Sequence, residues 1–126
     1  MKNAIHRFEI PKRDWKSLLE RFSETNSGLQ VELETHDRET QEHVTSHAAA
    51  LHSLALDLED EKNPRINVTV LSGNKEIRHI LFRPSQVILH ASRKTGDEAL
   101  TIESLNTKTT VHLKRRSPPA LMDRVA

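Results

Sequence analysis

The stretch INVTVLSGNKEIRHILF, residues 66–82, carries the clearest fold signal in the chain. From Ile66 to Val70, apolar residues alternate with polar ones, which is the period of a half-buried β-strand. The segment Ser72-Gly73-Asn74-Lys75 has the composition of a tight turn, and residues 77–82 beyond it are again rich in apolar side chains. We therefore predict a β-hairpin here, and an antiparallel sheet around it.

Similar alternation recurs on both sides of this hairpin. The other predicted strands lie at 29–34, 87–91, 100–102 and 111–113, with turns at 93–97 and 106–107. Several short strands joined by small turns are typical of an antiparallel meander that forms a small barrel or sandwich. The prolines of Ser117-Pro118-Pro119 cannot continue a central strand, because proline has no backbone N–H for the ladder.

One amphipathic helix is predicted before the strands, over about residues 11–25. Its apolar positions follow i, i+3, i+4, i+7 spacing and are Trp15, Leu18, Leu19 and Phe22. Pro11 suits a first turn, and Gly28 suits the end of a helix. We expect Trp15 in the core and a single α+β domain over 1–116, with strands from about 29 to 115 and a Pro-containing tail at 117–126.

Residues 39–62 are ambiguous by periodicity alone. As a helix, the segment places Val44, Ala48, Leu51, Ala55 and Leu58 at 4-3-4-3 spacing. As a strand, its leucines from Leu54 to Leu58 alternate with other residues. Both interpretations stay open on the pattern.

Several motifs together resemble an uncharacterised bacterial family, a domain of unknown function. The motifs are the Ile10-Pro11-x-x-x-Trp15 helix, the segment from His79 to Arg83-Pro84, and the strand Glu98-Ala99-Leu100-Thr101-Ile102-Glu103-Ser104. The resemblance implies an α+β or mostly β domain and favours strands over 39–62. It implies no activity. The sequence departs from the family at Asn106-Thr107-Lys108, where an Asp-Gly type turn is usual.

Composition excludes several kinds of chemistry. The 126 residues include no cysteine, which rules out disulfides, thiolate metal sites and Cys nucleophiles. The three glycines are isolated, so no phosphate-cradling loop is present, and the acidic pair Asp97-Glu98 sits at a predicted turn, where we expect it to be solvated. No apolar run is long enough for a membrane span. We expect a cytoplasmic protein with no catalytic residues, no cofactor and no membrane contact.

The balanced net charge of +1 hides an asymmetry along the chain. Residues 1–63 hold 8 Lys or Arg and 13 Asp or Glu, whereas residues 64–126 hold 11 and 5, so the halves carry −5 and +6. The basic second half offers a nucleic-acid-binding patch, namely Arg78, Arg93, Lys94, Lys114, Arg115 and Arg116. The low aromatic content argues against this interpretation, since single-strand binding usually adds stacking rings.

Histidines supply the other candidate sites. His43 and His47 could share a metal ion only on a helix, because on a strand they would lie roughly 13 Å apart at about 3.3 Å per residue. We therefore predict no metal site and solvated histidines. His79 and Arg83 are the candidate binding residues, because on one strand they would share a face and could hold an anion or carboxylate. The alternative is that Arg83 pairs with a structural acid such as Asp57.

The function predicted from these features is that of a non-enzymatic interaction or accessory module. Its partner would be an unidentified protein or a second copy of the chain, since opposed charges and exposed edge strands both favour a salt-sensitive homodimer. The alternative is an electrostatic nucleic-acid-binding module that uses the basic second half. An enzyme or metal-binding protein ranks third.

Overall fold

The computed structural model describes residues 5–114, apart from the side chains of residues 46–48. Over this range the chain forms one α-helix, a short 3-10 turn and eight strands. The elements are β1 (Ile5–Glu9), η1 (Lys12–Asp14), α1 (Trp15–Asn26), β2 (Gln30–Asp37), β3 (His43–Asp57), β4 (Arg65–Ser72), β5 (Lys75–Phe82), β6 (Gln86–Ser92), β7 (Gly96–Glu103) and β8 (Thr107–Leu113). The predicted α+β class with an antiparallel sheet is thereby confirmed.

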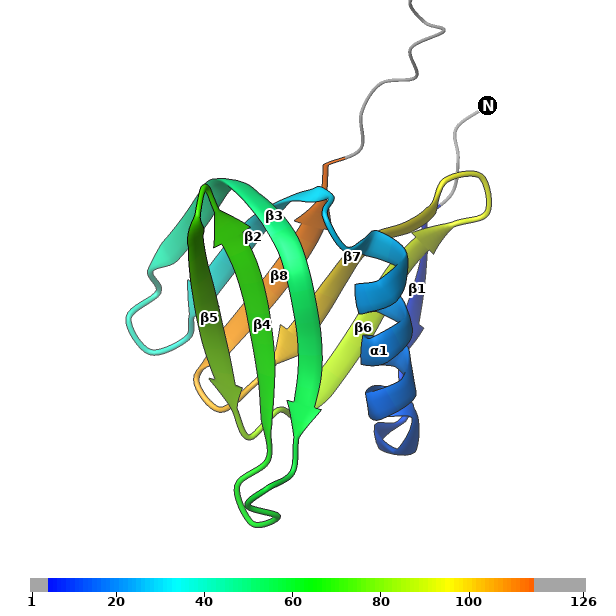
Figure 1. The fold of residues 1–126 in the computed structure, drawn as a ribbon. Coiled ribbons are helices and arrows are strands. Elements are labelled where there is room, and N and C mark those ends of the chain that lie inside the picture. The colour runs from blue at the N-terminus through cyan, green and yellow to red at the C-terminus, as the bar shows by residue number, and fades with distance from the viewer. Residues whose placement is uncertain (1–4, 115–126) are drawn as a thin grey trace, which may run out of the picture.

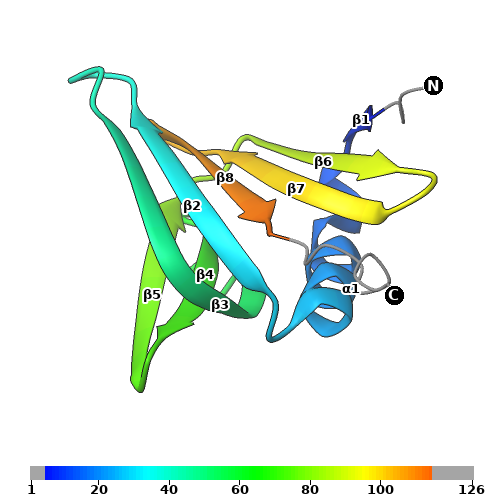
Figure 2. The same ribbon diagram turned by 90° about the horizontal axis from the view of Figure 1, so that it is seen from above.

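All strands belong to one antiparallel sheet in the order β1-β6-β7-β8-β2-β3-β4-β5. Two meanders, β2 to β5 and β6 to β8, are joined where β8 pairs with β2. Figures 1 and 2 show the sheet bending sharply, so that the two meanders form two wings with α1 at their open side. The sheet does not close, since β1 and β5 remain its edges, and the predicted barrel is therefore supported only loosely.

The helix begins where its sequence allows. Residues 12–14 form the 3-10 turn after Pro11, and the α-helix proper runs from Trp15 to Asn26, close to the predicted span. The indole Nε1 of Trp15 donates a hydrogen bond to the Ile10 carbonyl at 2.9 Å, which ties the helix start to the preceding chain. Gly28, at φ 87°, makes the turn into β2. Trp15 is only 3% exposed, which confirms its prediction as a core residue.

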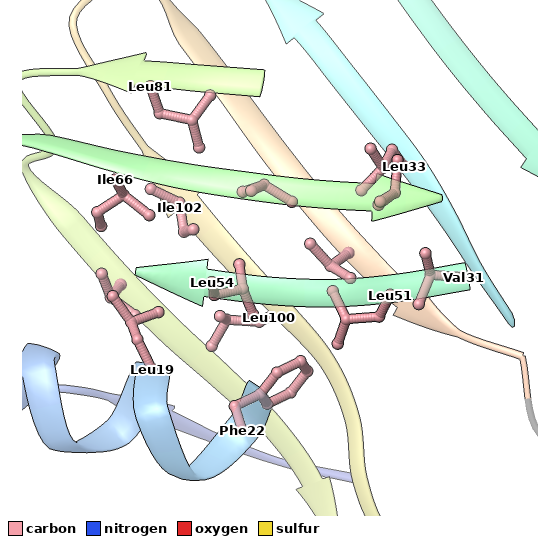
Figure 3. Packing of buried hydrophobic residues seen from close by; sticks show 14 of the residues in the cluster. Leu19, Phe22, Val31, Leu33, Leu51, Leu54, Ile66, Leu81, Leu100 and Ile102 are labelled. Carbon is pink, nitrogen blue, oxygen red and sulfur yellow. The ribbon is translucent and has the colours of Figure 1, made fainter. Parts of the chain in front are cut away.

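The hydrophobic core fills the concave side of the sheet. Leu19 and Phe22 of α1 meet apolar side chains from both wings, among them Leu54 and Leu100 (Figure 3). Most of these side chains come from alternate positions of their strands, as the sequence pattern predicted. Because one continuous core joins helix and sheet, burial of these side chains is the main source of stability.

The ambiguous region is a strand, and its irregularity explains the ambiguity. β3 runs from His43 to Asp57, as the family resemblance favoured. Its pairing with β4 shifts register between Leu51 and Ser53, so that Leu51 and Leu54 are both buried although three residues apart. A β-bulge of this kind gives a strand the i, i+3 spacing of a helix. The helical stripe is not buried at its ends, since Val44 is 59% exposed.

Two local predictions need correction. β1 lies before the first predicted strand, and all five of its residues are exposed, so no apolar alternation marks it. Asp97, expected in a solvated turn, is the second residue of β7, lies opposite Ala91 of β6 and is only 9% exposed.

The predicted hairpin at residues 72–75 is confirmed, with a two-residue turn in which Gly73 has φ 65°. The predicted tail at 117–126 lies outside the described residues.

Candidate functional site

The two candidate binding residues do not share a strand face. His79 lies in β5 opposite Val68, half-buried on the concave side, and burial lowers the pKa of its imidazole. Arg83 follows the last residue of β5 and is exposed, with a left-handed backbone at φ 51°. The predicted row of His79, Leu81 and Arg83 therefore ends at Leu81, because the chain turns before the arginine.

Asp57, the expected partner of Arg83, forms an ion pair with Arg65 instead. Asp57 and Arg65 lie opposite each other across β3 and β4, and Arg65 Nη2 is 3.0 Å from Asp57 Oδ2. The proposed Arg83–Asp57 pair is therefore wrong. The guanidinium of Arg83 makes no hydrogen bond or ion pair with the other residues described between 5 and 114.

Arg83 instead belongs to a corner where three loops converge. Its backbone N–H donates to the Pro64 carbonyl at 2.8 Å, from the loop between β3 and β4. The Phe82 carbonyl accepts from Leu105 N–H at 2.9 Å, from the turn between β7 and β8. A cavity of about 480 Å³ opens at this corner, lined by Asp60, Asn63, Arg65, Phe82, Arg83 and Leu105. Leu105 and the adjoining Asn63 gave no signal in the sequence beyond their place in turns.

The residues of the predicted basic patch do not form one face. Arg93 and Lys94 lie in the turn between β6 and β7. Arg78 lies on the edge strand β5, which is separated in the sheet from β8, the strand that precedes Lys114, by the three strands β2, β3 and β4. Lys114, at the end of β8, has its Nζ 3.8 Å from a carboxylate oxygen of Glu32. Arg115 and Arg116 lie outside the described residues.

The fold also mixes the acidic and basic halves of the chain. Ion pairs link residues of the first half to residues of the second, namely Arg21–Asp97, Arg38–Glu103, Glu34–His112 and Glu32–Lys114. Acidic and basic residues of both halves are thus interleaved in the folded domain, although of these four pairs Glu32–Lys114 alone joins an acid of residues 1–63 to a Lys or Arg of the second half. This leaves little support for an extended basic surface on the described part of the chain.

Histidines gather on the convex face of the sheet, around one carboxylate. Glu34 Oε2 lies 2.5 Å from His43 Nε2, and Glu34 Oε1 lies 2.7 Å from His112 Nε2. We call the group of Glu34, His43 and His112 the clamp, and it joins β2, β3 and β8. Its hydrogen bonds lower the pKa of Glu34, chiefly the bond from His112. The sequence drew attention to His43 but not to Glu34 or His112, because their proximity depends on strand order.

The metal prediction concerned His43 and His47, which both lie in β3 rather than on a helix. The side chain of His47 is outside the described residues. No three His, Asp or Glu side chains of the described part are placed to hold a metal ion. A hollow of about 490 Å³ beside the clamp includes His90, Thr101 and His112. Burial lowers the pKa of His90, and the positive charge of Arg7 adds to the effect.

The open edge of β5 is the most extended recognition feature. Ile77, Ile80 and Phe82 are 36%, 40% and 51% exposed along it. The two-residue hairpin makes Ser72 and Lys75 a hydrogen-bonded pair, and every second pair after them repeats this arrangement. The backbone groups of alternate residues therefore face outward from the sheet, and the carbonyl of Phe82, which accepts from Leu105, is one of them.

These features can be compared with known families. The sequence model of a family of unknown function, DUF5335, matches residues 6–123, which is most of the chain. The chain belongs to the DUF5335 family. The expectation of membership in an uncharacterised family is confirmed, and the match covers the helix and the eight described strands of this DUF5335 domain except Ile5, the first residue of β1. No curated protein and no solved structure matched the chain.

The described part of this DUF5335 chain contains no membrane-spanning helix. Its single described helix, α1, is 12 residues long, and no helix in the described range is long and apolar enough to cross a bilayer.

Proposed function

We propose that this domain is a non-enzymatic protein-interaction module that binds through the open edge of β5, and that its partner is a second copy of the same chain. The observation that carries the proposal is the self-complementary charge pattern of that edge, where Glu76 and Arg78 lie two residues apart on one face. We further propose a bacterial cytoplasmic setting, in line with the family resemblance seen in the sequence.

The edge is ready for strand addition. The outward-facing backbone groups belong to Glu76, Arg78 and Ile80, since the residues between them form the hydrogen-bonded pairs with β4. Strand addition to such an edge satisfies a row of backbone donors and acceptors at once. A second β5 in antiparallel orientation would extend the sheet across a two-fold axis.

Charge selects one register of this pairing. In a two-fold pair of β5 strands, residues that lie opposite each other have their side chains on the same face of the sheet. The second strand can therefore shift along the first only in steps of two residues, and each step is one register. One of them places Arg78 opposite itself, and another places Glu76 opposite itself, which brings like charges together. The register between these two places Glu76 opposite Arg78 of the second copy, and does so twice by symmetry.

The same register brings apolar surface together. Its axis passes beside Ile77, so the two Ile77 side chains, each 36% exposed, meet on the concave face. On the convex face, the nearest partner of Glu76 in the free domain is His52 Nε2, at 3.7 Å. Because Glu76 and His52 are both about half exposed, that contact contributes little and leaves the carboxylate available.

Charge-reversal variants test the proposal by molar mass in solution, measured with light scattering after gel filtration. Wild type should dimerise at low salt and dissociate as salt rises, because exposed ion pairs are screened. Glu76→Lys and Arg78→Glu should each be monomeric, since each places like charges opposite each other twice. Mixing the two variants should restore a dimer, because each introduced charge then faces its opposite. Lys94→Glu, in the exposed turn between β6 and β7, is the control.

Three results would overturn this proposal. A wild-type monomer at both low and high salt removes the dimer altogether. A dimer that survives both single reversals, or a mixture of the two variants that stays monomeric, removes β5 and this register as the contact. The Lys94→Glu control must dimerise like wild type for the comparison to hold.

A further inference from the structure

We infer that the cavity at the Arg83 corner is a binding site for an apolar molecule that carries one carboxylate, whether a free acid or the C-terminus of a peptide. Three features carry it: the cavity, its apolar wall, and an arginine that has no ion pair within the part of the chain that the structure describes. It does not depend on the pairing of β5 with a second copy.

The cavity has a fixed frame and an apolar wall. Three main-chain hydrogen bonds hold the converging loops together, from Arg83 N–H to Pro64, from Leu105 N–H to Phe82, and from Ser85 N–H to Glu103 at 2.7 Å. Phe82 and Leu105, 51% and 57% exposed, line the hollow. Apolar side chains left in water around a concave site mark places where an apolar group can be buried.

Arg83 supplies the charge. Arg83 lines the cavity, and its guanidinium makes no hydrogen bond or ion pair with the other described residues, so its five donors remain available. A planar guanidinium matches a carboxylate with two parallel hydrogen bonds.

The backbone at this position makes the presence of arginine informative. The backbone of a residue with a Cβ atom is strained at φ 51°, whereas glycine adopts this conformation without strain. Non-glycine residues held in such conformations cluster at functional sites. The chain therefore bears a local strain at Arg83, the cavity cation that has no ion pair with another residue of the described range 5–114.

The other charged groups in the wall are already engaged. Arg65 is held by Asp57, as described above. Asp60 accepts hydrogen bonds from Asn63 Nδ2 at 3.0 Å and from Lys62 N–H at 3.1 Å, and the Asn63 bond is the largest cause of its lowered pKa. Asp60 thus remains a carboxylate and repels a second negative charge. The cavity favours a monocarboxylate over a dicarboxylate.

Titration followed by two-dimensional NMR tests this inference, with phenylacetate as the probe. Phenylacetate should shift the backbone signals of Phe82, Arg83 and Leu105 in a saturable manner. Acetate, which lacks the ring, and benzyl alcohol, which lacks the charge, should bind at least about tenfold more weakly, as expected for the loss of one charged hydrogen bond or one buried apolar group. N-acetylphenylalanine and its amide distinguish a peptide C-terminus from a free acid as the source of the carboxylate.

The decisive variant is Arg83→Gly, which removes the guanidinium and relieves the backbone strain, so loss of folding does not confound the result. It should weaken phenylacetate binding at least about tenfold. Arg93→Gly, at an exposed arginine in the turn between β6 and β7, is the matched control and should bind as wild type does. The titrations are repeated in the Glu76→Lys background, which separates this site from dimerisation.

Four outcomes would overturn the inference. Three of them are equal binding of benzyl alcohol and phenylacetate, unchanged binding in Arg83→Gly, and signal shifts that lie outside the corner. Loss of binding only in the Glu76→Lys background would also overturn it, because the site would then belong to the interface. A monomeric wild type that still binds phenylacetate at the corner would reject the dimer and support the site.

Discussion

Asn26, in the last turn of α1, donates a hydrogen bond from Nδ2 to Asp97 Oδ2 at 3.1 Å, although 71 residues separate the two in the chain. Asn26 is 1% exposed and Asp97 is 9% exposed, so this is a polar contact inside the domain. Arg21 adds two hydrogen bonds to the same carboxylate, at 3.0 and 3.4 Å. The pair fixes the end of the helix to the start of β7, beside the apolar contacts of Leu19 and Phe22.

The first prediction concerns this contact. Asp97→Ala removes the charged acceptor that Asn26 and Arg21 share, although Asn26 Nδ2 keeps its second acceptor, the Phe22 carbonyl at 3.0 Å. The variant should destabilise the domain by about 1.5–3 kcal/mol, the contribution of hydrogen bonds to a charged group. Urea denaturation followed by circular dichroism measures the change. Glu20→Ala, which removes an exposed Lys16–Glu20 pair on the same helix, should change stability by less than about 0.5 kcal/mol. Equal losses in both variants would contradict the role given to Asp97.

The second prediction concerns acid stability through His79. Burial lowers the pKa of His79 in the folded state. In the unfolded chain the imidazole of His79 has its ordinary pKa of about 6.5, so it binds a proton at a higher pH there. Stability is therefore complete above that value and falls as pH drops from about 6.5 toward the folded-state pKa.

His79→Leu removes this titration, so the decline in stability between about pH 6.5 and pH 5 should become shallower. Urea midpoints measured across this range in wild type and variant give the comparison. His90 remains in the variant and has a lowered pKa for a similar reason, so part of the decline should persist. A decline as steep as that of wild type would show that His79 does not contribute.

The third prediction concerns the clamp on the convex face. The hydrogen bonds from His112 and His43 lower the pKa of Glu34, so its contribution to stability is present above about pH 4.3 and is lost as pH falls through the folded-state pKa. Glu34 is 38% exposed, and solvent screening keeps the effect to less than about 1 kcal/mol. Glu34→Gln should therefore be slightly less stable than wild type at pH 6 and equal to it near pH 2. A difference that persists at pH 2 would point to packing rather than charge.

The fourth prediction concerns the strained arginine. Arg83→Gly relieves the left-handed backbone at φ 51° and should raise stability by about 0.5–1 kcal/mol, visible as a higher melting temperature. Arg83→Ala keeps the strain, and because Arg83 has no ion pair among the described residues, its melting temperature should stay close to that of wild type. A loss of stability in both variants would show that the arginine supports the fold, as its suggested pairing with Asp57 had implied.

Local patterns were sufficient for many elements. Apolar alternation predicted β4 and β5 and the turn between them, because side chains on a strand alternate between core and solvent. The stripe of Trp15, Leu19 and Phe22 predicted the buried face of α1. The bulge in β3 defeated the same reasoning, since one extra residue gives a strand the spacing of a helix.

The chain's charge layout and its candidate sites required the tertiary structure. The sequence by itself determined the α+β class, the buried helix face, the hairpin turns and the absence of thiol chemistry, because each depends on residues close together in the chain. Only the tertiary structure placed Glu34 between His43 and His112 and paired Asp57 with Arg65. It also left Arg83 at a cavity with no ion pair to another described residue. These contacts follow from strand order and from where strands end, and both are set by the packing of the whole core rather than by any local pattern.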